Sequence, residues 1–326
     1  MTNLTASDAE PVVAVVGVTQ RFGDVLALDH VDLTLARGRV LALLGHNGAG
    51  KTTLVHILST LIPATSGEAR VAGYDVRTQS LDVRRRIGLT GQFAAVDASL
   101  SGLENLSLIG RLLGLSARQS RSRADALLAQ FDLVDAAGRA AGTYSGGMRR
   151  RLDLAASLVG EPEVLFLDEP TSGLDPVAKH SMWEHVDELV ASGTSVLLTT
   201  QDLDEADRLA DQVVVLSHGA VVGRGTAAAL KARYGEQSVV VTLTDPDRDL
   251  DPVFARLSDD GFPTAHRRSD GALVVAVASS ADLLPVAATL QSLHVTALAV
   301  ELVQPTLDDV YFALTVGPKT PITEAA

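Results

Sequence analysis

The segment Gly45–Thr52, with the sequence GHNGAGKT, constrains the fold of this chain more than any other. It fits the pattern G-x-x-x-x-G-K-[ST] and follows an apolar run, Val40–Leu44. The residues after it repeat leucine at helical spacing. A strand, a glycine-rich loop and a helix in this order gather backbone N–H groups at a helix N-terminus, where they bind phosphate. The sequence therefore predicts an α/β fold of the P-loop NTPase kind.

Each residue type in this loop has an expected role in binding ATP with Mg²⁺. Lys51 reaches the terminal phosphates, and the Thr52 hydroxyl is a ligand of the metal. A glycine-rich turn with a surface lysine is the alternative, and the flanking strand and helix argue against it. The residues expected to bind nucleotide here are Gly45, His46, Asn47, Gly48, Ala49, Gly50, Lys51, Thr52 and Thr53.

A second apolar run, Val164–Leu167, ends in two neighbouring carboxylates, Asp168 and Glu169. Successive side chains of a strand point to opposite faces, so the two acids can have separate roles. We expect Asp168 to hold Mg²⁺ through water and Glu169 to orient and deprotonate the water that attacks ATP. An acidic strand end is weak evidence alone, and the phosphate loop strengthens it.

Buried-type apolar runs alternate with helical patterns through the first two thirds of the chain, as in a largely parallel sheet. The runs are Val40–Leu44, Val164–Leu167, Val196–Leu198 and Val213–Leu216. Val12–Val18 and Leu33–Leu35 are instead typical of half-exposed strands and predict an antiparallel sheet beside the core. Helical spacing between about Gly91 and Thr143 indicates a helical insertion.

Beyond Gly235, which we expect to cap a helix over Ala227–Tyr234, the patterns indicate a second domain. They follow the order strand, helix, strand, strand, helix, strand, which is the ferredoxin-like order. The first of these helices is expected over Pro252–Leu257 and the second strand near Thr264–Arg267.

These boundaries divide the chain into a large and a small domain. We expect a nucleotide-binding domain over residues 12–235, with its helical subdomain at about 91–143, and a small α+β accessory domain over 236–316. The two ends, residues 1–11 and 317–326, are expected to be disordered.

Tyr144–Met148, with the sequence YSGGM, precedes a helix and ends 20 residues before Asp168. With this segment the chain resembles the ABC ATPase family, whose signature is usually Leu-Ser-Gly-Gly-Gln. The resemblance implies that Ser145, Gly146 and Gly147 bind the γ-phosphate of ATP held by another subunit. Ser-Gly-Gly is also a common helix N-cap, which is the alternative when the motif stands alone.

Further motifs follow in the order that the family has them, and the resemblance covers about residues 12–234. Phe22 is implied to stack on adenine, Gln92 to bind nucleotide and Mg²⁺ as the Q-loop residue, and Asp175 to belong to the D-loop. A lone Phe usually lies in the core and a lone Gln usually lies on the surface. The family is therefore favoured by all the motifs occurring together in the same order along the chain.

One position departs from the family pattern. Where the switch histidine normally follows a strand, this chain has Thr199, Thr200 and Gln201. An amide can hydrogen-bond a phosphate oxygen, but it cannot take up a proton near neutral pH. Gln201 is therefore expected to act in catalysis by orientation, and proton transfer is left to Glu169.

Within the family, the chain looks like the daunorubicin-resistance type of exporter ATPase. The resemblance rests on YSGGMRRRLDLA, on Gln201 and on the C-terminal PTLDDVY. It implies efflux of a drug, antibiotic or other hydrophobic compound through a separate integral membrane permease subunit. It also implies a homodimer that closes around two ATP·Mg²⁺. No apolar run approaches the roughly 20 residues that cross a bilayer, so we expect a peripheral protein at the cytoplasmic face of the cell membrane.

Composition and domain content narrow the possible functions of the chain. A net charge of −13 argues against nucleic acid as a partner, and the absence of cysteine excludes thiolate chemistry. A soluble ABC ATPase of DNA repair or of the ribosome would have a long coiled coil or a second cassette, which this chain lacks. A regulatory nucleotide switch without transport is the other alternative, because Gln201 is compatible with slow turnover. The presence of Glu169 argues against it.

Overall fold

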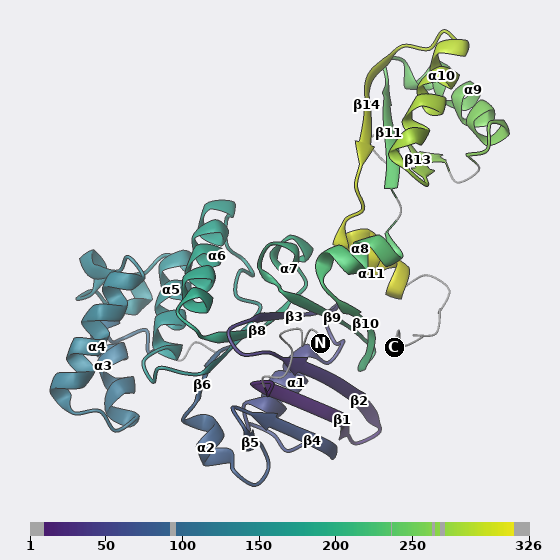
Figure 1. Cartoon of the computed structure of the whole chain (residues 1–326). Helices are drawn as coiled ribbons and strands as arrows, with labels where there is room; N and C mark the ends of the chain where they lie inside the picture. The colour runs from purple at the N-terminus through teal and green to yellow at the C-terminus, as the bar shows by residue number, and fades with distance from the viewer. Residues whose placement is uncertain (1–9, 92–95, 236, 263–264, 268–270, 316–326) are drawn as a thin grey trace, which may run out of the picture. The chain divides into compact units, whose positions relative to one another are not determined.

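The computed structural model describes residues 10–91, 96–235, 237–262, 265–267 and 271–315. Their packing divides the chain into two compact units between Ala227 and Ala228 (Figure 1). The sequence placed this boundary later, after Gly235. Helix α8 (Ala227–Tyr234) belongs to the second unit apart from its first residue, and Gly235 at its end lies against Pro305 of that unit. The ends expected to be disordered fall outside the described residues, apart from Glu10 and Pro11.

A six-stranded sheet in the order β10-β9-β3-β8-β7-β6 forms the centre of the first unit. Every neighbouring pair is parallel except β10 with β9. Every residue of β3, β7 and β8 is buried, which is why these strands are continuous apolar runs in the sequence. The strands are β3 (Val40–Leu44), β6 (Ile87–Thr90), β7 (Val164–Asp168), β8 (Ser195–Thr200), β9 (Gln212–Ser217) and β10 (Ala220–Gly225).

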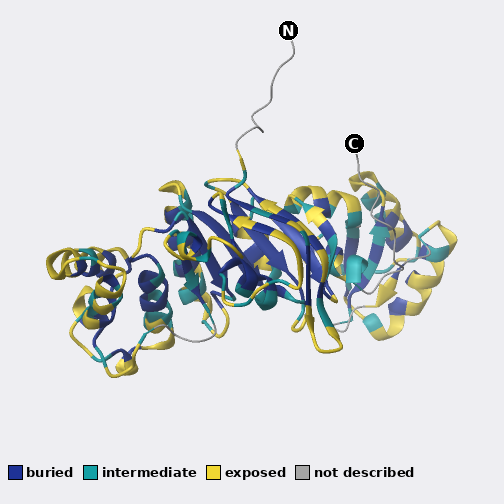
Figure 2. Ribbon diagram, turned by 90° about the horizontal axis from the view of Figure 1, so that it is seen from below, coloured by how far each residue is buried: buried dark blue, intermediate teal, exposed yellow. Residues whose placement is uncertain are grey.

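An antiparallel sheet in the order β2-β1-β4-β5 belongs to the same unit. Its strands are β1 (Val13–Phe22), β2 (Val25–Leu35), β4 (Ser66–Val71) and β5 (Tyr74–Asp75). One core joins the two sheets: it includes Val31 of β2, Leu54 of helix α1, and Leu43 and Phe166 of the six-stranded sheet. The strands at the middle of this unit are accordingly dark blue in Figure 2, whereas the outer turns of the helices are yellow.

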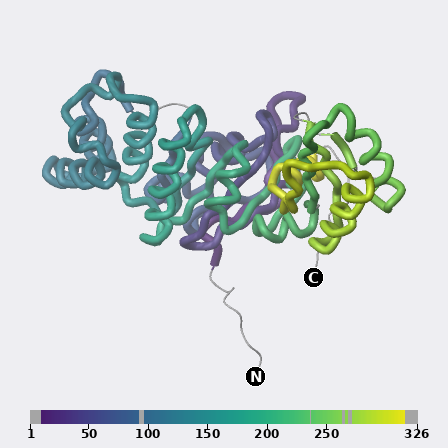
Figure 3. Tube along the Cα trace, turned by 90° about the horizontal axis from the view of Figure 1, so that it is seen from above, coloured from purple at the N-terminus to yellow at the C-terminus, as the bar shows by residue number. Residues whose placement is uncertain are grey.

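The helices of the first unit are α1 (Lys51–Leu58), α2 (Ser80–Arg84), α3 (Gly102–Leu112), α4 (Ala117–Gln130), α5 (Gly146–Ser157), α6 (Pro176–Ala191) and α7 (Leu203–Leu209). Helices α3 and α4 form the expected helical insertion and lie to one side of the sheets (Figures 1 and 3). Both begin with a capping box, Ser101 with Glu104 and Ser116 with Gln119. The S-x-x-[EQ] pattern thus sets where each of these helices starts.

The second unit contains β11 (Gln237–Leu243), α9 (Pro246–Asp259), β12 (His266–Arg267), β13 (Leu273–Val277), α10 (Leu283–Ser292) and β14 (Ala297–Val303), followed by α11 (Leu307–Thr315). Its antiparallel sheet has the order β12-β13-β11-β14. Helix α9 begins before the expected Pro252, because Asp245 accepts a hydrogen bond from the Arg248 N–H and caps it. Thr264, expected at the start of the second strand, lies outside the described residues.

Each unit has a hydrophobic core of its own, so we expect each to fold independently. Val275 is buried in the core of the second unit. Val275→Asp should unfold that unit alone, because a buried unpaired carboxylate costs roughly several kcal/mol. Calorimetry should show two transitions for the wild type and the loss of one in the variant, with ATP affinity retained. The control is Val274→Asp, on the opposite face of the strand and only half-buried. Loss of ATP binding in Val275→Asp would contradict independent folding.

Candidate functional site

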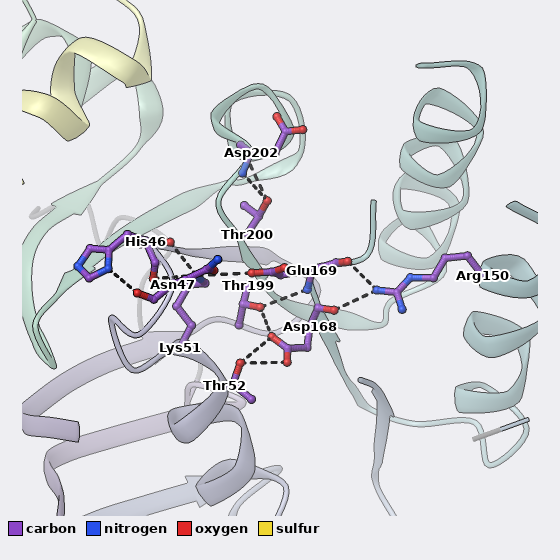
Figure 4. Close-up of polar contacts among 11 residues, drawn as sticks. His46, Asn47, Lys51, Thr52, Arg150, Asp168, Glu169, Thr199, Thr200 and Asp202 are labelled. Atoms are coloured by element: carbon purple, nitrogen blue, oxygen red, sulfur yellow. Dashed lines mark hydrogen bonds and ion pairs between the residues drawn. The ribbon is translucent and has the colours of Figure 1, made fainter. Parts of the chain in front are cut away.

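The candidate site lies where the parallel strands β3, β7 and β8 end. In parallel pairing the carboxyl ends of neighbouring strands meet at the same edge of the sheet, where α/β proteins bind ligands. The phosphate loop follows β3, Asp168 ends β7 and Gln201 follows β8. Pairing of β3 with β8, and of β8 with β7, therefore brings these three segments together (Figure 4).

The ammonium group of Lys51 lies inside the phosphate loop. Its Nζ donates hydrogen bonds to the carbonyl oxygen atoms of Gly45, at 2.7 Å, and His46, at 3.2 Å. The Oε1 atom of Glu169 lies 3.7 Å from the same Nζ, and the lysine side chain is only 4% exposed. Burial lowers the pKa of Lys51, and the charges of Glu169 and Asp168 partly oppose that shift. The loop therefore presents a desolvated cation, which an anionic phosphate group would stabilise.

Two glycines of the loop are required by close packing. Gly50 has φ +109°, and a Cβ there would lie 2.7 Å from the carbonyl oxygen of Ala27. A Cβ on Gly45 would lie 2.5 Å from the carbonyl oxygen of Leu216. Both clashes involve backbone atoms, so no side-chain rearrangement relieves them. The glycine pattern thus reflects the packing of the loop against β2 and β9 as well as phosphate binding.

Asp168 connects the phosphate loop to β8. The hydroxyl of Thr52 donates to its Oδ2 atom at 3.1 Å, and the hydroxyl of Thr199 donates to its Oδ1 atom. Carboxylate and hydroxyl oxygen atoms are ligands that Mg²⁺ accepts, directly or through water. Thr52 and Asp168, both expected as metal ligands, therefore lie together and fit that ion.

Thr199 was not among the residues selected from the sequence. A signal for it exists, because it ends the apolar run of β8 just before Gln201, at the same sheet edge as Asp168. The register pairs Asp168 with Thr199, and the Glu169 N–H donates to the Thr199 carbonyl oxygen at 3.0 Å. To predict the contact of Thr199 with Asp168 from the sequence, one would need to know which strands are neighbours in the sheet. The apolar runs do not specify that order.

Glu169 has a left-handed backbone conformation, with φ +50°. Such a conformation costs a residue with a side chain on the order of 1–3 kcal/mol, and it persists only where the surroundings hold it. It turns the chain sharply at the end of β7, so that the Glu169 side chain lies near Lys51 and is 20% exposed. Glu169 is accessible to a water molecule and adjacent to the group expected to bind phosphate.

Gln201 is exposed and shares a cavity of about 370 Å³ with Glu169. An ion pair between Lys179 of α6 and Asp202 fixes the start of α7 immediately after it. The structure therefore brings Lys51 close to Glu169 and Thr52 into contact with Asp168, while Gln201 lines the cavity that Glu169 also lines. Gln92, the expected Q-loop residue, lies outside the described residues.

The remaining candidates lie on other elements. Ser145 caps α5 by accepting a hydrogen bond from the Met148 N–H at 3.2 Å, and Gly146 and Gly147 begin that helix. Asp175 caps α6 by accepting from the Ala178 N–H at 2.9 Å. Phe22, at the end of β1, is 50% exposed, as an aromatic ring available for stacking must be.

Tyr144, which stands where the family signature usually has Leu, is buried. Its hydroxyl donates to the carbonyl oxygen of Ala136 at 2.7 Å. Burial raises the pKa of this phenol. The hydroxyl also lies so close to α3 that a Cβ on Gly102 would be 2.4 Å from it. Tyr144 thus joins the signature segment to the helical insertion.

Comparison with known proteins gives consistent results. The ABC transporter family model matches residues 28–172. The chain is 48% identical to the daunorubicin resistance ATP-binding protein DrrA3 of Streptomyces coeruleorubidus, covering 98% of this chain and 100% of that protein. It is 44% identical to the doxorubicin resistance ATP-binding protein DrrA of Mycobacterium tuberculosis, strain H37Rv, covering 95% and 96%.

Solved structures with the same fold include an ATP-binding subunit of an ABC transporter, with a TM-score of 0.62 and 28% identity over 69% of this chain and 93% of that one. A second is an ATP-binding cassette seen as a dimer in a post-hydrolysis state with ADP and Pi, with a TM-score of 0.60 and 25% identity over 66% and 98%. They confirm the ABC-type α/β fold predicted from the motifs. With a phosphate loop, paired carboxylates and relatives that match nearly its whole length, this chain belongs to the ABC transporter family as an ATP-hydrolysing, ATP-binding subunit.

Proposed function

We propose that this chain energises an exporter by hydrolysing ATP, while a separate integral membrane permease subunit carries a drug, antibiotic or other hydrophobic compound. ATP hydrolysis is supported by two contacts, that of Lys51 with Glu169 and that of Thr52 with Asp168. The export part is supported by relatives described as daunorubicin and doxorubicin resistance ATP-binding proteins, which match nearly the full chain.

ATP binding is assigned to the phosphate loop and the residues around it. Backbone N–H groups of Gly45–Thr53 and the Lys51 ammonium hold the β- and γ-phosphates, and the exposed ring of Phe22 stacks on adenine. Thr52 and Asp168, together with Gln92, hold Mg²⁺, which neutralises phosphate charge when it is bound. These residues offer hydroxyl, carboxylate and amide oxygen atoms, a donor set suited to that ion.

Hydrolysis is assigned to Glu169 and Gln201. Glu169 accepts a proton from a water molecule as the water oxygen forms a bond to the γ-phosphorus and the bond to the bridging oxygen of ADP breaks. Lys51 stabilises the negative charge on the transferred group. Gln201 holds a γ-phosphate oxygen or the attacking water through its amide, and Glu169 alone takes the proton.

We assign to the signature segment, Ser145, Gly146 and Gly147, the binding of the nucleotide that a second copy of this chain holds. Helix α5 begins at Gly146, so its first N–H groups carry partial positive charge suited to a phosphate. Two copies of this chain would close head-to-tail around two ATP·Mg²⁺, with Asp175 of the D-loop near the interface. The related cassette described as a dimer in a post-hydrolysis state supports dimerisation of this chain. ATP binding favours the closed dimer and hydrolysis releases it.

We propose that the membrane subunit docks on the helical insertion, near residues 92–105. None of the helices in the described part of the chain is long and apolar enough to span a bilayer. We propose that a second, membrane-spanning chain carries the compound and holds this one at the cytoplasmic face of the membrane. The exposed Leu108 and Leu112 of α3 are consistent with a protein partner on this insertion. The rival functions, a soluble ABC ATPase or a regulatory switch, find no support among the relatives.

The function is tested by expressing the chain with its membrane partner in a drug-sensitive bacterial host and measuring efflux of daunorubicin. The wild type should lower drug accumulation several-fold, and Glu169→Gln should abolish the effect because it removes the base. The same variant should bind ATP and accumulate as an ATP-loaded dimer in gel filtration.

Val16→Ala is the control, an exposed position on β1 that should leave export unchanged. Export that persists in Glu169→Gln would refute the energising role. ATP hydrolysis without export or a copurifying membrane chain would favour the soluble or regulatory alternatives.

The role of Gln201 gives a separate prediction. Gln201→Ala should hydrolyse ATP on the order of 10²–10³ times more slowly with little change in nucleotide affinity, because it loses a contact made to the reacting phosphate. Gln201→His should restore turnover, since imidazole makes a similar contact. The measurement is kcat at saturating ATP for the three proteins. Wild-type turnover in the alanine variant would place the γ-phosphate sensor elsewhere.

A further inference from the structure

Arg150 of helix α5 contacts the backbone of the segment that carries the proposed catalytic base. Its guanidinium donates hydrogen bonds to the carbonyl oxygen atoms of Glu169 at 2.7 Å, Pro170 at 2.8 Å and Asp168 at 3.0 Å. Figure 4 shows Arg150 reaching this segment from the neighbouring helix. Three successive carbonyl groups are thus held by one side chain.

The chemistry of arginine suits this contact. Its planar guanidinium presents five N–H donors in a fixed fork, and hydrogen bonds from a charged donor are stronger than neutral ones. The Arg150 side chain is 20% exposed, and the carboxylate of buried Asp153 lies 3.8 Å from it on the same helix. The fork is therefore restrained, and its charge has a partner.

The contact occurs where the backbone needs support. Glu169 has φ +50°, which a residue with a side chain adopts only when its surroundings hold it. On one side, its N–H donates to the Thr199 carbonyl oxygen at 3.0 Å. On the other side, Arg150 binds its carbonyl oxygen. The two peptide groups that flank the Glu169 side chain are thus both fixed, from different elements.

We propose that Arg150 is a positioning residue for ATP hydrolysis, which holds the Glu169 backbone in the conformation that directs its carboxylate at the attacking water. The inference rests on the proposed role of Glu169 as the base and deepens it. In this role Arg150 acts through the backbone of Glu169, whose carbonyl oxygen it binds.

The position of Arg150 on α5 gives the contact a second consequence. Ser145, Gly146 and Gly147 at the start of this helix are the residues proposed to bind the second copy's ATP. Arg150 lies little more than one turn further along the helix. A movement of α5 when the partner's γ-phosphate binds would therefore reach Glu169 directly.

The test compares steady-state hydrolysis by the full-length Arg150→Ala and Arg150→Lys variants with the wild type. Arg150→Ala should lower kcat by about 10- to 100-fold, the scale expected when a reacting group is slightly misplaced, with the Kd for ATP within about twofold of wild type. Arg150→Lys keeps the charge but loses the fork, and should fall between the two. It also carries the test if the alanine variant fails to fold.

Arg123→Ala is the matched control. Arg123 also donates to a backbone carbonyl, that of Leu158 at 2.7 Å, and its side chain is 29% exposed, but it lies on α4 away from Glu169. It should leave kcat unchanged even if the melting temperature falls. An equal loss of kcat in Arg123→Ala and Arg150→Ala would overturn the proposal, as would a loss of ATP affinity that accounts for the slower rate.

A double-mutant cycle of Arg150 and Glu169 tests whether Arg150 acts through Glu169, separately from whether Glu169 is the base. If Arg150 acts only through the base, Arg150→Ala should slow the residual single-turnover hydrolysis of Glu169→Gln by less than about twofold. Additive losses would overturn the proposal while leaving Glu169 as the base. Normal hydrolysis by Glu169→Gln would instead refute the proposed base, and with it this inference.

Discussion

The register between β7 and β8 is the constraint on which the site depends. It pairs Asp168 with Thr199, so that the acid at the end of one strand accepts a hydrogen bond from the strand beside it and another from Thr52 of the phosphate loop. A one-residue slip would turn every side chain of β8 to the opposite face of the sheet. Burial of all the residues of both strands prevents such a slip, so the apolar core sets the geometry of the polar site.

Two kinds of force therefore meet at the end of β7. Hydrophobic burial fixes the strands, and hydrogen bonds from side chains and backbone fix the sharp turn at Glu169. A functional group on a strained but fully restrained turn needs little reorganisation before reaction, which is how electrostatic preorganisation lowers a barrier. The strain in this turn is offset by the stability of a core that β3, β7 and β8 share.

Much of this arrangement was predictable from the sequence, for reasons that particular residues make clear. The phosphate loop and Asp168 follow continuous apolar runs, and the parallel α/β order places such strand ends together. Thr199 and Arg150 were missed because their roles depend on spatial neighbours that local patterns do not encode. The start of α9 was misplaced because Pro252 resembles a first helical residue, whereas Asp245 and Pro246 begin the helix earlier. Gln92 and, apart from Glu10 and Pro11, both chain ends lie outside the described residues, so the expectations about them stay predictions.

The fit between Tyr144 and Gly102 has a consequence for how this type of chain can diverge. The tyrosine hydroxyl occupies the space that any larger residue at 102 would need, and it satisfies the buried carbonyl of Ala136. Replacing Tyr144 by leucine would remove one of the two hydrogen bonds to that carbonyl, which also accepts from the Arg139 N–H at 2.9 Å. It would also open room beside α3, which a side chain at 102 would then fill. Each change is unfavourable alone and compatible with the other. The two positions are therefore expected to vary as a pair among descendants of this sequence, so that an alignment of many relatives would show a small residue at 102 wherever the signature begins with tyrosine.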